Sequence, residues 1–393
     1  MATLPDTAVE KPVNPALAKG AQIPLQTFTL PTFPPEATGL KALTLTSDIK
    51  LDEYSSLLKN FVTIPQLPPS IESLTLELFS LGYPPGFLNA LSQQLPNIKS
   101  LVLYSQLFAG ITAESQKDAV RFFENAEQLR ALHLLDVFSR PHFFEAIGKL
   151  LAGREKGLMF LEVNYTFRHE DEEFLARIPA SELPSLIAPG MISCVLNISP
   201  PDVTNDPDDP SNLTENGEER PGGKQGVNVL NKTLAPSLVE ALTADVTAPK
   251  NLKVLNTTLY TLGVEQLRTI VSKHKGLLLL NATIYLEPTE ECKKSLLDAL
   301  AVCQELEQVE IVGNPSLDFF MAMSNPRRQA PTLQMVLPSA DDMKSLSASC
   351  KKLNKFSATV LRSTTLGTAQ WSRVGGNWEG GITSPGQPPE ASG

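Results

Sequence analysis

The sequence predicts an α/β solenoid, bent like a horseshoe, with a parallel β-sheet on its concave side and helices on its convex side. The first observation is a Leu-x-x-Leu-x-Leu pattern that recurs at intervals of roughly 25 to 34 residues. The second is that each copy alternates like a strand and precedes an amphipathic stretch with helical period. Because a helix needs about 10 Å of lateral room and paired strands about 4.8 Å, the stack must curve with its strands inside.

The strands are predicted from the copies of this pattern in chain order. LNTTLY from Leu255 and LNATIY from Leu280 are nearly identical, which indicates neighbouring strands in the same register. The copies near the C-terminus, LQMVLPS and LNKFSATVL, are more degenerate. A first set of predicted strands begins at Leu40, Ile71, Ile98, Leu129, Leu158 and Met191, and a second set at Leu255, Leu280, Leu306, Leu333 and Leu353.

A predicted helix follows most of these strands. Pro84, Pro85 and Pro141 lie where a first helical turn needs no backbone donor. Ser339 and Asp342 have the spacing of a capping box. The predicted helices span 52–60, 84–94, 114–127, 140–152, 170–177, 234–244, 262–273, 287–303, 315–324 and 339–350.

Three segments differ in composition from the repeats, which we assign to residues 39–198 and 227–363. Residues 1–38 are rich in Pro, Ala and Thr and predict an extended leader without ladder hydrogen bonds, lying over the first repeat. Residues 199–226 predict a disordered acidic insertion, and residues 364–393 a disordered tail. Trp371 and Trp378 in this tail either dock on a partner or pack back on the last repeat.

Composition limits the classes of function. The net charge is −10 and leaves no basic surface for a phosphate backbone, so we expect no nucleic-acid partner. No apolar run approaches the roughly 18 to 20 residues of a spanning helix, and the N-terminus lacks a secretory signal. The four cysteines contain no C-x-x-C pair. We expect a monomeric protein in the cytoplasm or nucleus, without membrane attachment, disulfide framework or cofactor.

These residues resemble a known family, the leucine-rich repeat proteins, in the irregular form seen in ribonuclease-inhibitor-like and F-box-associated chains. LEQVEIVGN, from Leu306 to Asn314, matches the family pattern L-x-x-L-x-L-x-x-N. The resemblance covers about residues 40 to 362. At the equivalent positions of other copies the Asn is replaced, which indicates less uniform coils. The resemblance implies a curved array that binds other proteins.

Catalytic and metal motifs are weak. The segment PGGKQG contains Gly223 and Lys224, but Glu218 and Gln225 break the phosphate-loop pattern. The run HEDEE, from His169 to Glu173, contains metal-ligating residue types, but acids at the start of a helix complement its dipole. We therefore predict no catalytic residue and no metal site, and we interpret the chain as a protein without enzymatic activity.

The concave surface is the candidate site, because the residues between the pattern's leucines face it. Val102, Tyr104, Leu135 and Phe160 predict an apolar patch on neighbouring strands. The pairs Asn256/Asn281 and Tyr260/Tyr285 predict two side-chain ladders, which either bind a partner or only stabilise adjacent strands. The predicted partner-binding residues are Glu77, Val102, Tyr104, His133, Leu135, Phe160, Glu162, Asn256, Tyr260, Asn281 and Tyr285.

The sequence therefore favours a non-enzymatic scaffold that binds another protein on its concave face. Two alternatives stay open. The resemblance implies a substrate-recognition subunit of an F-box-type ubiquitin ligase, although no F-box-like segment precedes Leu40. A regulator of a small GTPase is also compatible with a curved repeat array.

Overall fold

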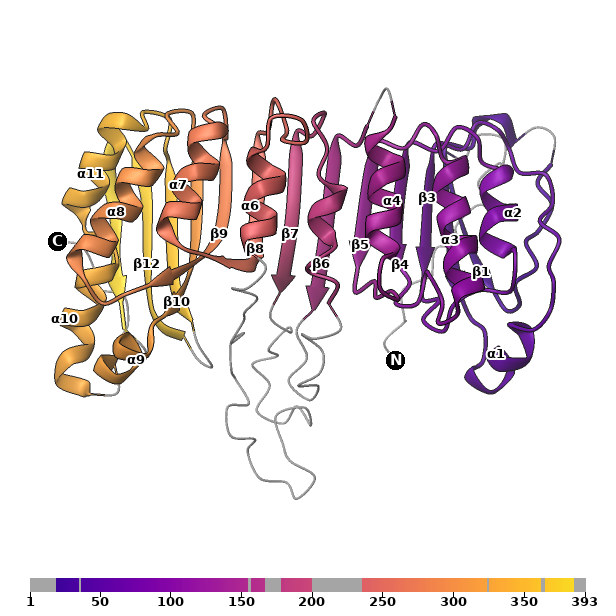
Figure 1. Cartoon of the computed structure of the whole chain (residues 1–393), viewed down its shortest axis with the longest axis horizontal. Helices are drawn as coiled ribbons and strands as arrows, with labels where there is room; N and C mark the ends of the chain where they lie inside the picture. The colour runs from indigo at the N-terminus through magenta and orange to yellow at the C-terminus, as the bar shows by residue number, and fades with distance from the viewer. Residues whose placement is uncertain are drawn as a thin grey trace, which may run out of the picture. The chain divides into compact units, whose positions relative to one another are not determined.

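The computed structural model describes residues 19–34, 37–154, 157–166, 178–199, 235–323, 325–361 and 365–384 (Figure 1). The chain divides into two compact units, unit 1 with Met1–Leu129 and unit 2 with Arg130–Gly393. Each unit is described by itself. The predicted acidic insertion, the predicted helix at 170–177, the HEDEE run and the PGGKQG segment lie outside the described residues.

Unit 1 contains four described strands that pair in parallel and in chain order. Helices follow its second, third and fourth strands, and α2 packs against α3. A short 3₁₀ turn at Ala37–Gly39 precedes the second strand. The strands are β1 (Gly20–Leu25), β2 (Ala42–Ser47), β3 (Ser73–Glu77) and β4 (Ser100–Tyr104), and the helices are α1 (Leu51–Leu57), α2 (Phe87–Gln93) and α3 (Ala113–Asn125).

Unit 2 begins with parallel strands in chain order: β5 (Ala131–Leu135), β6 (Phe160–Thr166), β7 (Ser193–Ser199), β8 (Val254–Leu262), β9 (Leu279–Leu286), β10 (Gln308–Pro315) and β11 (Lys355–Leu361). It ends with an antiparallel hairpin of β12 (Thr365–Val374) and β13 (Asn377–Thr383). The predicted α/β repeat class, with a parallel sheet and helices on one side, is confirmed.

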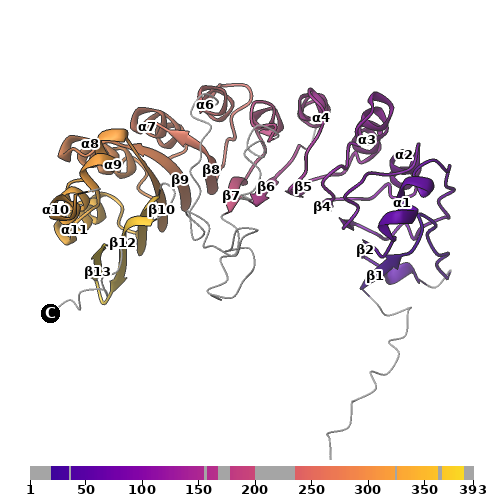
Figure 2. The ribbon, with the colours of Figure 1, turned by 90° about the horizontal axis from the view of Figure 1, so that it is seen from below.

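The helices of unit 2 lie along one face of its sheet and leave the other face open (Figure 2). Their lengths vary, and a 3₁₀ turn at Leu183–Leu186 lies between β6 and β7. We call the uncovered side of the sheet the open face. The helices are α4 (Phe143–Ala152), α6 (Ala235–Thr243), α7 (Val264–Lys273), α8 (Glu290–Ala301), α9 (Leu317–Met323), α10 (Pro326–Val336) and α11 (Ala340–Ser349).

The leucines of the sequence pattern form the core of each unit. In unit 1, Leu74 pairs in register with Leu101, and both side chains are fully buried. In unit 2, Leu255 pairs with Leu280, and at most 1% of either residue is exposed. Burying a leucine side chain contributes about 1.5 to 3 kcal/mol, so this periodic burial holds the coils in register.

A repeated backbone contact joins successive coils at the start of each strand. The carbonyl of Lys41 accepts hydrogen bonds from the N–H groups of Glu72 and Ser73, at 2.8 and 3.0 Å. In unit 2, the carbonyl of Leu278 similarly accepts from Glu307 and Gln308, at 2.8 and 3.1 Å. Because one acceptor serves two donors of the next coil, the strands begin at a common level.

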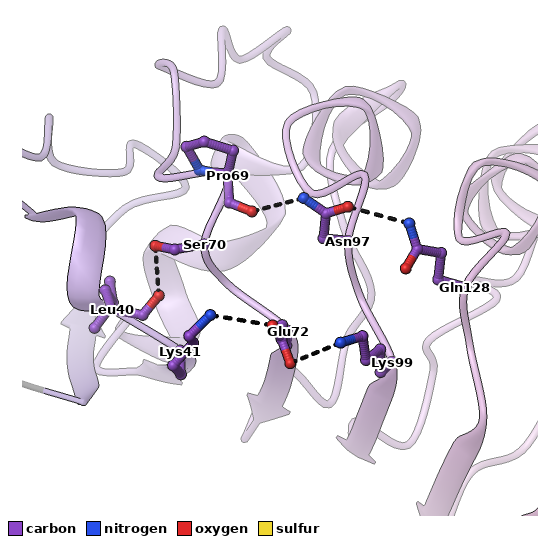
Figure 3. A network of polar contacts seen from close by, with 8 residues as sticks. All are labelled: Leu40, Lys41, Pro69, Ser70, Glu72, Asn97, Lys99 and Gln128. Atoms are coloured by element: carbon purple, nitrogen blue, oxygen red, sulfur yellow. Dashed lines mark hydrogen bonds and ion pairs between the residues drawn. The ribbon is translucent and has the colours of Figure 1, made fainter.

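Side chains reinforce the same edge in unit 1 (Figure 3). Glu72 lies between Lys41 and Lys99, with N–O distances of 3.1 and 3.0 Å. The hydrogen bond from Lys99, followed by that from Lys41, lowers the pKa of the Glu72 carboxyl below its ordinary value. The Asn97 amide donates to the Pro69 carbonyl at 2.8 Å and accepts from Gln128 at 3.1 Å. These exposed contacts align neighbouring coils but add little stability individually.

The predicted leader is wrong in one respect, because its last part forms a strand. β1 pairs in parallel with β2, and the carbonyl of Lys19 accepts from the N–H groups of Lys41 and Ala42, as the later coils do. Pro24 in β1 has no N–H to donate, and such a residue is tolerated in an edge strand. The ladder therefore begins before the first leucine copy.

The predicted disordered tail is also wrong for Thr365–Thr383, which forms the β12–β13 hairpin. Gly375 and Gly376 have φ angles of 58° and 92°, which fit the two-residue turn of a hairpin. Trp371 is only 7% exposed, and its ring N–H donates to the Pro338 carbonyl at 3.0 Å. Trp371 therefore packs back on the last repeat, the second of the two predicted options.

The remaining differences concern one predicted strand. The segment from Leu333 belongs to helix α10 instead of a strand, because Asn325 caps the helix and Pro326 occupies its first turn. The capping box of Ser339 and Asp342 is confirmed, and it begins α11. Within the described residues, no helix has the length and apolar character required to cross a membrane.

Candidate functional site: the open face of unit 2

Strand register brings polar side chains from five strands into one line on the open face. Asn256 pairs with Asn281, Asn281 with Glu310, Glu310 with Ser357, and Ser357 with Gln370. We call these five residues the amide row. They are partly or largely exposed, whereas their strand neighbours Leu255, Leu280, Val309, Phe356 and Trp371 are buried. The period of two along each strand produces this separation.

A second line runs beside the amide row, two residues earlier on each parallel strand. It is apolar on β8 and β9 and becomes polar toward the hairpin. We call it the outer row, and it consists of Val254, Leu279, Gln308, Lys355 and Ser372.

Both rows line a cavity of about 440 Å³ on the open face. The cavity extends from Val195 on β7 to Gln370 and Ser372 on β12. This volume is within the range of protein ligand sites, about 300 to 1,000 Å³. The elongated lining, contributed by six strands, favours an extended ligand over a compact one.

The amides of the row keep free hydrogen-bonding capacity. The side-chain oxygen of Asn256 accepts from the Thr258 N–H at 2.9 Å and lies 2.7 Å from the Thr258 hydroxyl. Its Nδ2 makes no hydrogen bond with a described residue. Asn281 Nδ2 donates to Glu310 Oε2 at 3.2 Å, and the Gln370 amide has no partner within the described part of the chain. Because all three residues line the cavity, these donors and acceptors are available to a ligand there.

A hydrogen-bonded chain continues from this row over β7, β6 and β5. The Thr258 hydroxyl lies 2.6 Å from Asn197 Oδ1, and Asn197 Nδ2 donates to Asn164 Oδ1 at 2.9 Å. Asn164 in turn donates to Glu162 Oε1 at 2.8 Å. Glu162 Oε2 lies 3.7 Å from His133 Nδ1. The structure thus brings together the predicted residues His133, Glu162, Asn256 and Asn281 on one face of one unit.

The two predicted apolar residues of unit 2 lie on β5 and β6, the same two strands that carry His133 and Glu162. Phe160 is 46% exposed, and Leu135 is partly exposed at the end of β5. An aromatic side chain exposed to this extent beside polar groups is a candidate contact for a partner.

Tyr260 is a correction. The sequence places it beside Tyr285 on the concave side, but it is completely buried and its hydroxyl donates to the Ala180 carbonyl at 2.8 Å. The register shifts between Asn256 and Thr261, where Thr257 to Tyr260 on β8 face only Ala282 on β9. These extra residues turn Tyr260 into the core. Tyr285 is partly buried and pairs with Asn314 on β10.

The other predicted residues belong to unit 1. Glu77 pairs in register with Tyr104, and Val102 pairs with Thr75, and all of these side chains are partly exposed. They alternate with the buried leucines and therefore lie on the face of β3 and β4 opposite to the leucine core. The predicted apolar patch combined Val102 and Tyr104 of unit 1 with Leu135 and Phe160 of unit 2, so it stays a prediction.

Six polar residues of the site were not among the predicted partner-binding residues. Gln308 and Glu310 occupy the facing positions of the LEQVEIV copy, and Lys355 and Ser357 occupy those of the copy at Leu353. The same pattern that gives Asn256 and Asn281 would have found them. Gln370 and Ser372 carry no such signal, because β12 is antiparallel and outside the repeat.

The open face of unit 2 offers hydrogen-bonding groups, whereas buried thiols of the unit are held in their protonated form. Burial raises the pKa of the Cys194 thiol to about 12, so this thiol stays protonated. Burial, followed by the neighbouring Cys303, raises the pKa of Cys350 to about 11. In the portion of the chain that the structure describes, no group of three His, Cys, Asp or Glu side chains is arranged to hold a metal ion.

Comparison with known proteins gives matches only among solved structures. No family model and no curated protein matches the chain. The leucine-rich repeat-containing protein LegL7 from Legionella pneumophila is 16% identical, with a TM-score of 0.37, and the match covers 88% of this chain and 92% of that one. An internalin (inlF) from Listeria monocytogenes is 10% identical, with a TM-score of 0.31, and the match covers 82% and 81% of the two chains.

At these identities and TM-scores neither similarity supports a functional conclusion. The fold class rests on the parallel register, the buried leucines and the helices along one sheet face in unit 2. These features are those of a leucine-rich-repeat-like α/β solenoid.

Proposed function

We propose that this chain is a non-enzymatic scaffold that binds a partner protein on the open face of unit 2. The observation that carries the proposal is the cavity of about 440 Å³ along the amide row, which is lined by amide side chains that keep free hydrogen-bonding capacity. An uncovered sheet face with this lining has the capacity to hold a polypeptide without further rearrangement.

The chemistry of the row fits a peptide main chain. Asn256, Asn281 and Gln370 each carry an amide, and a main chain offers uncharged N–H and C=O groups that pair with amides. Each such hydrogen bond contributes about 0.5 to 1.5 kcal/mol net. Val254 and Leu279 add apolar contact beside them. Several weak contacts in a line favour an extended segment of a partner.

The proposed partner-binding residues are revised accordingly. His133, Leu135, Phe160, Glu162, Asn256 and Asn281 stay in the set, and Gln308, Glu310, Lys355 and Gln370 join it. Tyr260 leaves it because the residue is buried. Tyr285, Glu77, Val102 and Tyr104 stay proposals.

Affinity purification with two matched charge reversals tests this proposal. Glu310→Arg changes the centre of the amide row, and Glu291→Arg changes an exposed position on helix α8. We expect Glu310→Arg to lose the partner that the wild-type chain retains and Glu291→Arg to keep it, with unchanged circular dichroism for both. Equal retention by the two variants would remove the open face from the proposal.

The same purification separates the alternatives left open by the sequence. Peptides from a cullin adaptor would favour an F-box-type ligase subunit, as the ribonuclease-inhibitor-like or F-box-associated resemblance implies. A small GTPase would favour a regulator. No contact within the described residues favours either of these alternatives over a general scaffold.

A further inference from the structure

Unit 1 contains a second cavity, of about 460 Å³, that is separate from the proposed partner-binding face. It lies between the loops that follow β3 and β4, the end of α1 and the first turns of α2 and α3. We call it the loop pocket and define it by Leu58, Leu81, Tyr83, Ile111, Lys117 and Arg121. Its volume is within the range of small-ligand sites, about 300 to 1,000 Å³.

One wall of the loop pocket and part of its rim are apolar. Tyr83 stacks on Phe87 with a centroid distance of 5.4 Å and an interplanar angle of 16°, and it meets Phe108 edge-on. Ile111 is 71% exposed and Leu81 is 40% exposed at the rim. Two large apolar side chains exposed beside an apolar wall gain free energy when a ligand covers them.

Hydrogen bonds fix the surrounding loops before any ligand binds. The Tyr54 hydroxyl donates to the Gly82 carbonyl at 3.1 Å and ties α1 to the loop after β3. The Asp118 carboxylate accepts from the N–H groups of Leu88 and Asn89, each at 3.1 Å, and ties α3 to the start of α2. A fixed wall reduces the entropic cost of binding.

Two cations of α3 line the loop pocket beside this apolar wall. Lys117 and Arg121 are four residues apart and therefore lie on the same side of the helix. Neither makes an ion pair or a hydrogen bond with a described residue. Asp118, the acid between them, already accepts two N–H groups, and Glu114 is the other acid of the lining. The positive charge of Arg121 lowers the pKa of the Asp118 carboxyl, against the larger raising effect of burial, but no ion pair within the described residues holds either cation. Both cations are therefore available to an anion in the pocket.

We propose that the loop pocket binds a ligand with an apolar body and an anionic group. The apolar body lies against Tyr83, Leu81 and Ile111, and the anionic group pairs with Lys117 and Arg121. The chemistry is shared by free amphiphilic acids and by acidic peptide segments with a bulky apolar residue. This inference does not depend on the function proposed for the open face of unit 2.

Two fluorescent probes of nearly the same shape test the proposal on the full chain. Anilinonaphthalene sulfonate carries the anion, and N-phenyl-naphthylamine is its uncharged counterpart. We compare the double variant Lys117→Ser/Arg121→Ser with Lys275→Ser/Lys294→Ser, which removes two exposed cations of unit 2 and leaves the same net charge. Removing two partly solvated ion pairs predicts roughly tenfold weaker binding of the anionic probe to the first variant only.

The uncharged probe distinguishes lost charge from a lost fold. It should bind the Lys117→Ser/Arg121→Ser variant as well as it binds the wild-type chain. Ile111→Ser should weaken both probes, whereas Val246→Ser, at a position that is 83% exposed in unit 2, should weaken neither. Equal anionic-probe affinity in the two double variants, or parallel loss of both probes when the cations are removed, would overturn the proposal.

Competition then identifies the source of the ligand. Laurate and an acetylated peptide with one tryptophan followed by three glutamates are titrated against the bound anionic probe. Displacement by laurate assigns the pocket to free amphiphilic acids, and displacement by the peptide assigns it to acidic segments. If neither displaces the probe at concentrations that saturate other acid-binding sites, the proposed ligand chemistry is wrong.

Discussion

Substitutions at Tyr260 on β8 test whether this residue stabilises the core or contacts a partner. The sequence pattern makes Tyr260 a partner contact, but the structure buries it completely and pairs its hydroxyl with the Ala180 carbonyl at 2.8 Å. Burial, with smaller effects of Tyr165 and Cys194, raises its pKa well above the ordinary value, so the hydroxyl stays protonated as a donor. Changes at Tyr260 should therefore reduce stability first.

The size of the effect follows from two substitutions. Tyr260→Phe leaves the Ala180 carbonyl without its donor and should cost about 1 to 3 kcal/mol. Tyr260→Ala also removes the buried ring and should cost about 3 to 5 kcal/mol, the range for large aromatic side chains in a core. With a urea m-value of about 3 kcal/mol/M, Tyr260→Ala should lower the unfolding midpoint by roughly 1 to 2 M.

Urea unfolding followed by circular dichroism provides the assay, and Asn256→Ala on the same strand is the control. Asn256 is partly exposed, and its substitution removes only the hydrogen bond from Thr258, so it should lower the midpoint less than Tyr260→Ala and should weaken partner binding. A Tyr260→Ala variant that keeps the wild-type midpoint and loses partner binding would show that Tyr260 contacts the partner instead of stabilising the core.

Three further predictions concern other buried positions. Burial lowers the pKa of His274 below its ordinary value of 6.5, while its Nε2 lies 2.6 Å from the Leu242 carbonyl. As pH falls, His274 is therefore protonated in the unfolded chain before it is protonated in the folded chain, which favours unfolding. At pH values below 6.5 the urea midpoint of the wild type should decrease, and that of His274→Gln should decrease less. An equal dependence of the midpoint on pH in both proteins would contradict this prediction. Trp371→Ala should lower the free energy of unfolding by about 3 to 5 kcal/mol, because the buried ring attaches the hairpin to the Pro338 carbonyl, and Trp371→Phe should lower it less. A urea midpoint of Trp371→Ala equal to that of the wild type would show that this contact contributes no stability. Gly110→Ala should lower the free energy of unfolding by about 1 to 3 kcal/mol, because φ at Gly110 is +63° and an added Cβ would collide with Ser115. Gly86→Ala should have a smaller effect, because φ is also positive there but the space around the Cβ is open. Thermal unfolding of the two variants measures the difference, and an equal loss in both would contradict the role of the collision.

The sequence predicts the fold well wherever the period of leucines is intact. The copies at Leu255 and Leu280 give the correct pairing of Asn256 with Asn281, because a parallel register is determined by which side chains enter the core. The pairing of Leu74 with Leu101 follows in the same way. Candidate residues at the start of a strand are therefore predictable from the pattern.

Positions after an irregularity are not predictable in this way. Tyr260 follows the register shift in β8, and a shift in register moves side chains to the opposite face. Counting positions from the first leucine of a copy assumes a regular strand, and the extra residues in β8 break this assumption. The pairing of Tyr260 with Tyr285 fails for this reason.

The amino-acid composition of the two ends of the array does not reveal that they form strands. Pro24 suggests a coil, but an edge strand tolerates proline on its unpaired side. Gly375 and Gly376 suggest disorder, but a pair of glycines between alternating strands is a hairpin turn. In both segments the decisive contact is made with a neighbouring coil, as with Trp371 and Pro338, and only coordinates show it.

Side-chain footprinting of the chain with and without its retained partner measures directly whether the partner covers the open face of unit 2. Hydroxyl-radical labelling reports the solvent exposure of individual side chains. Phe160 and Leu279 on the open face should lose reactivity in the complex, whereas Val246 and Leu317, which are 83% and 65% exposed, should keep it. Unchanged labelling of Phe160 and Leu279, with protection elsewhere, would contradict binding at the open face.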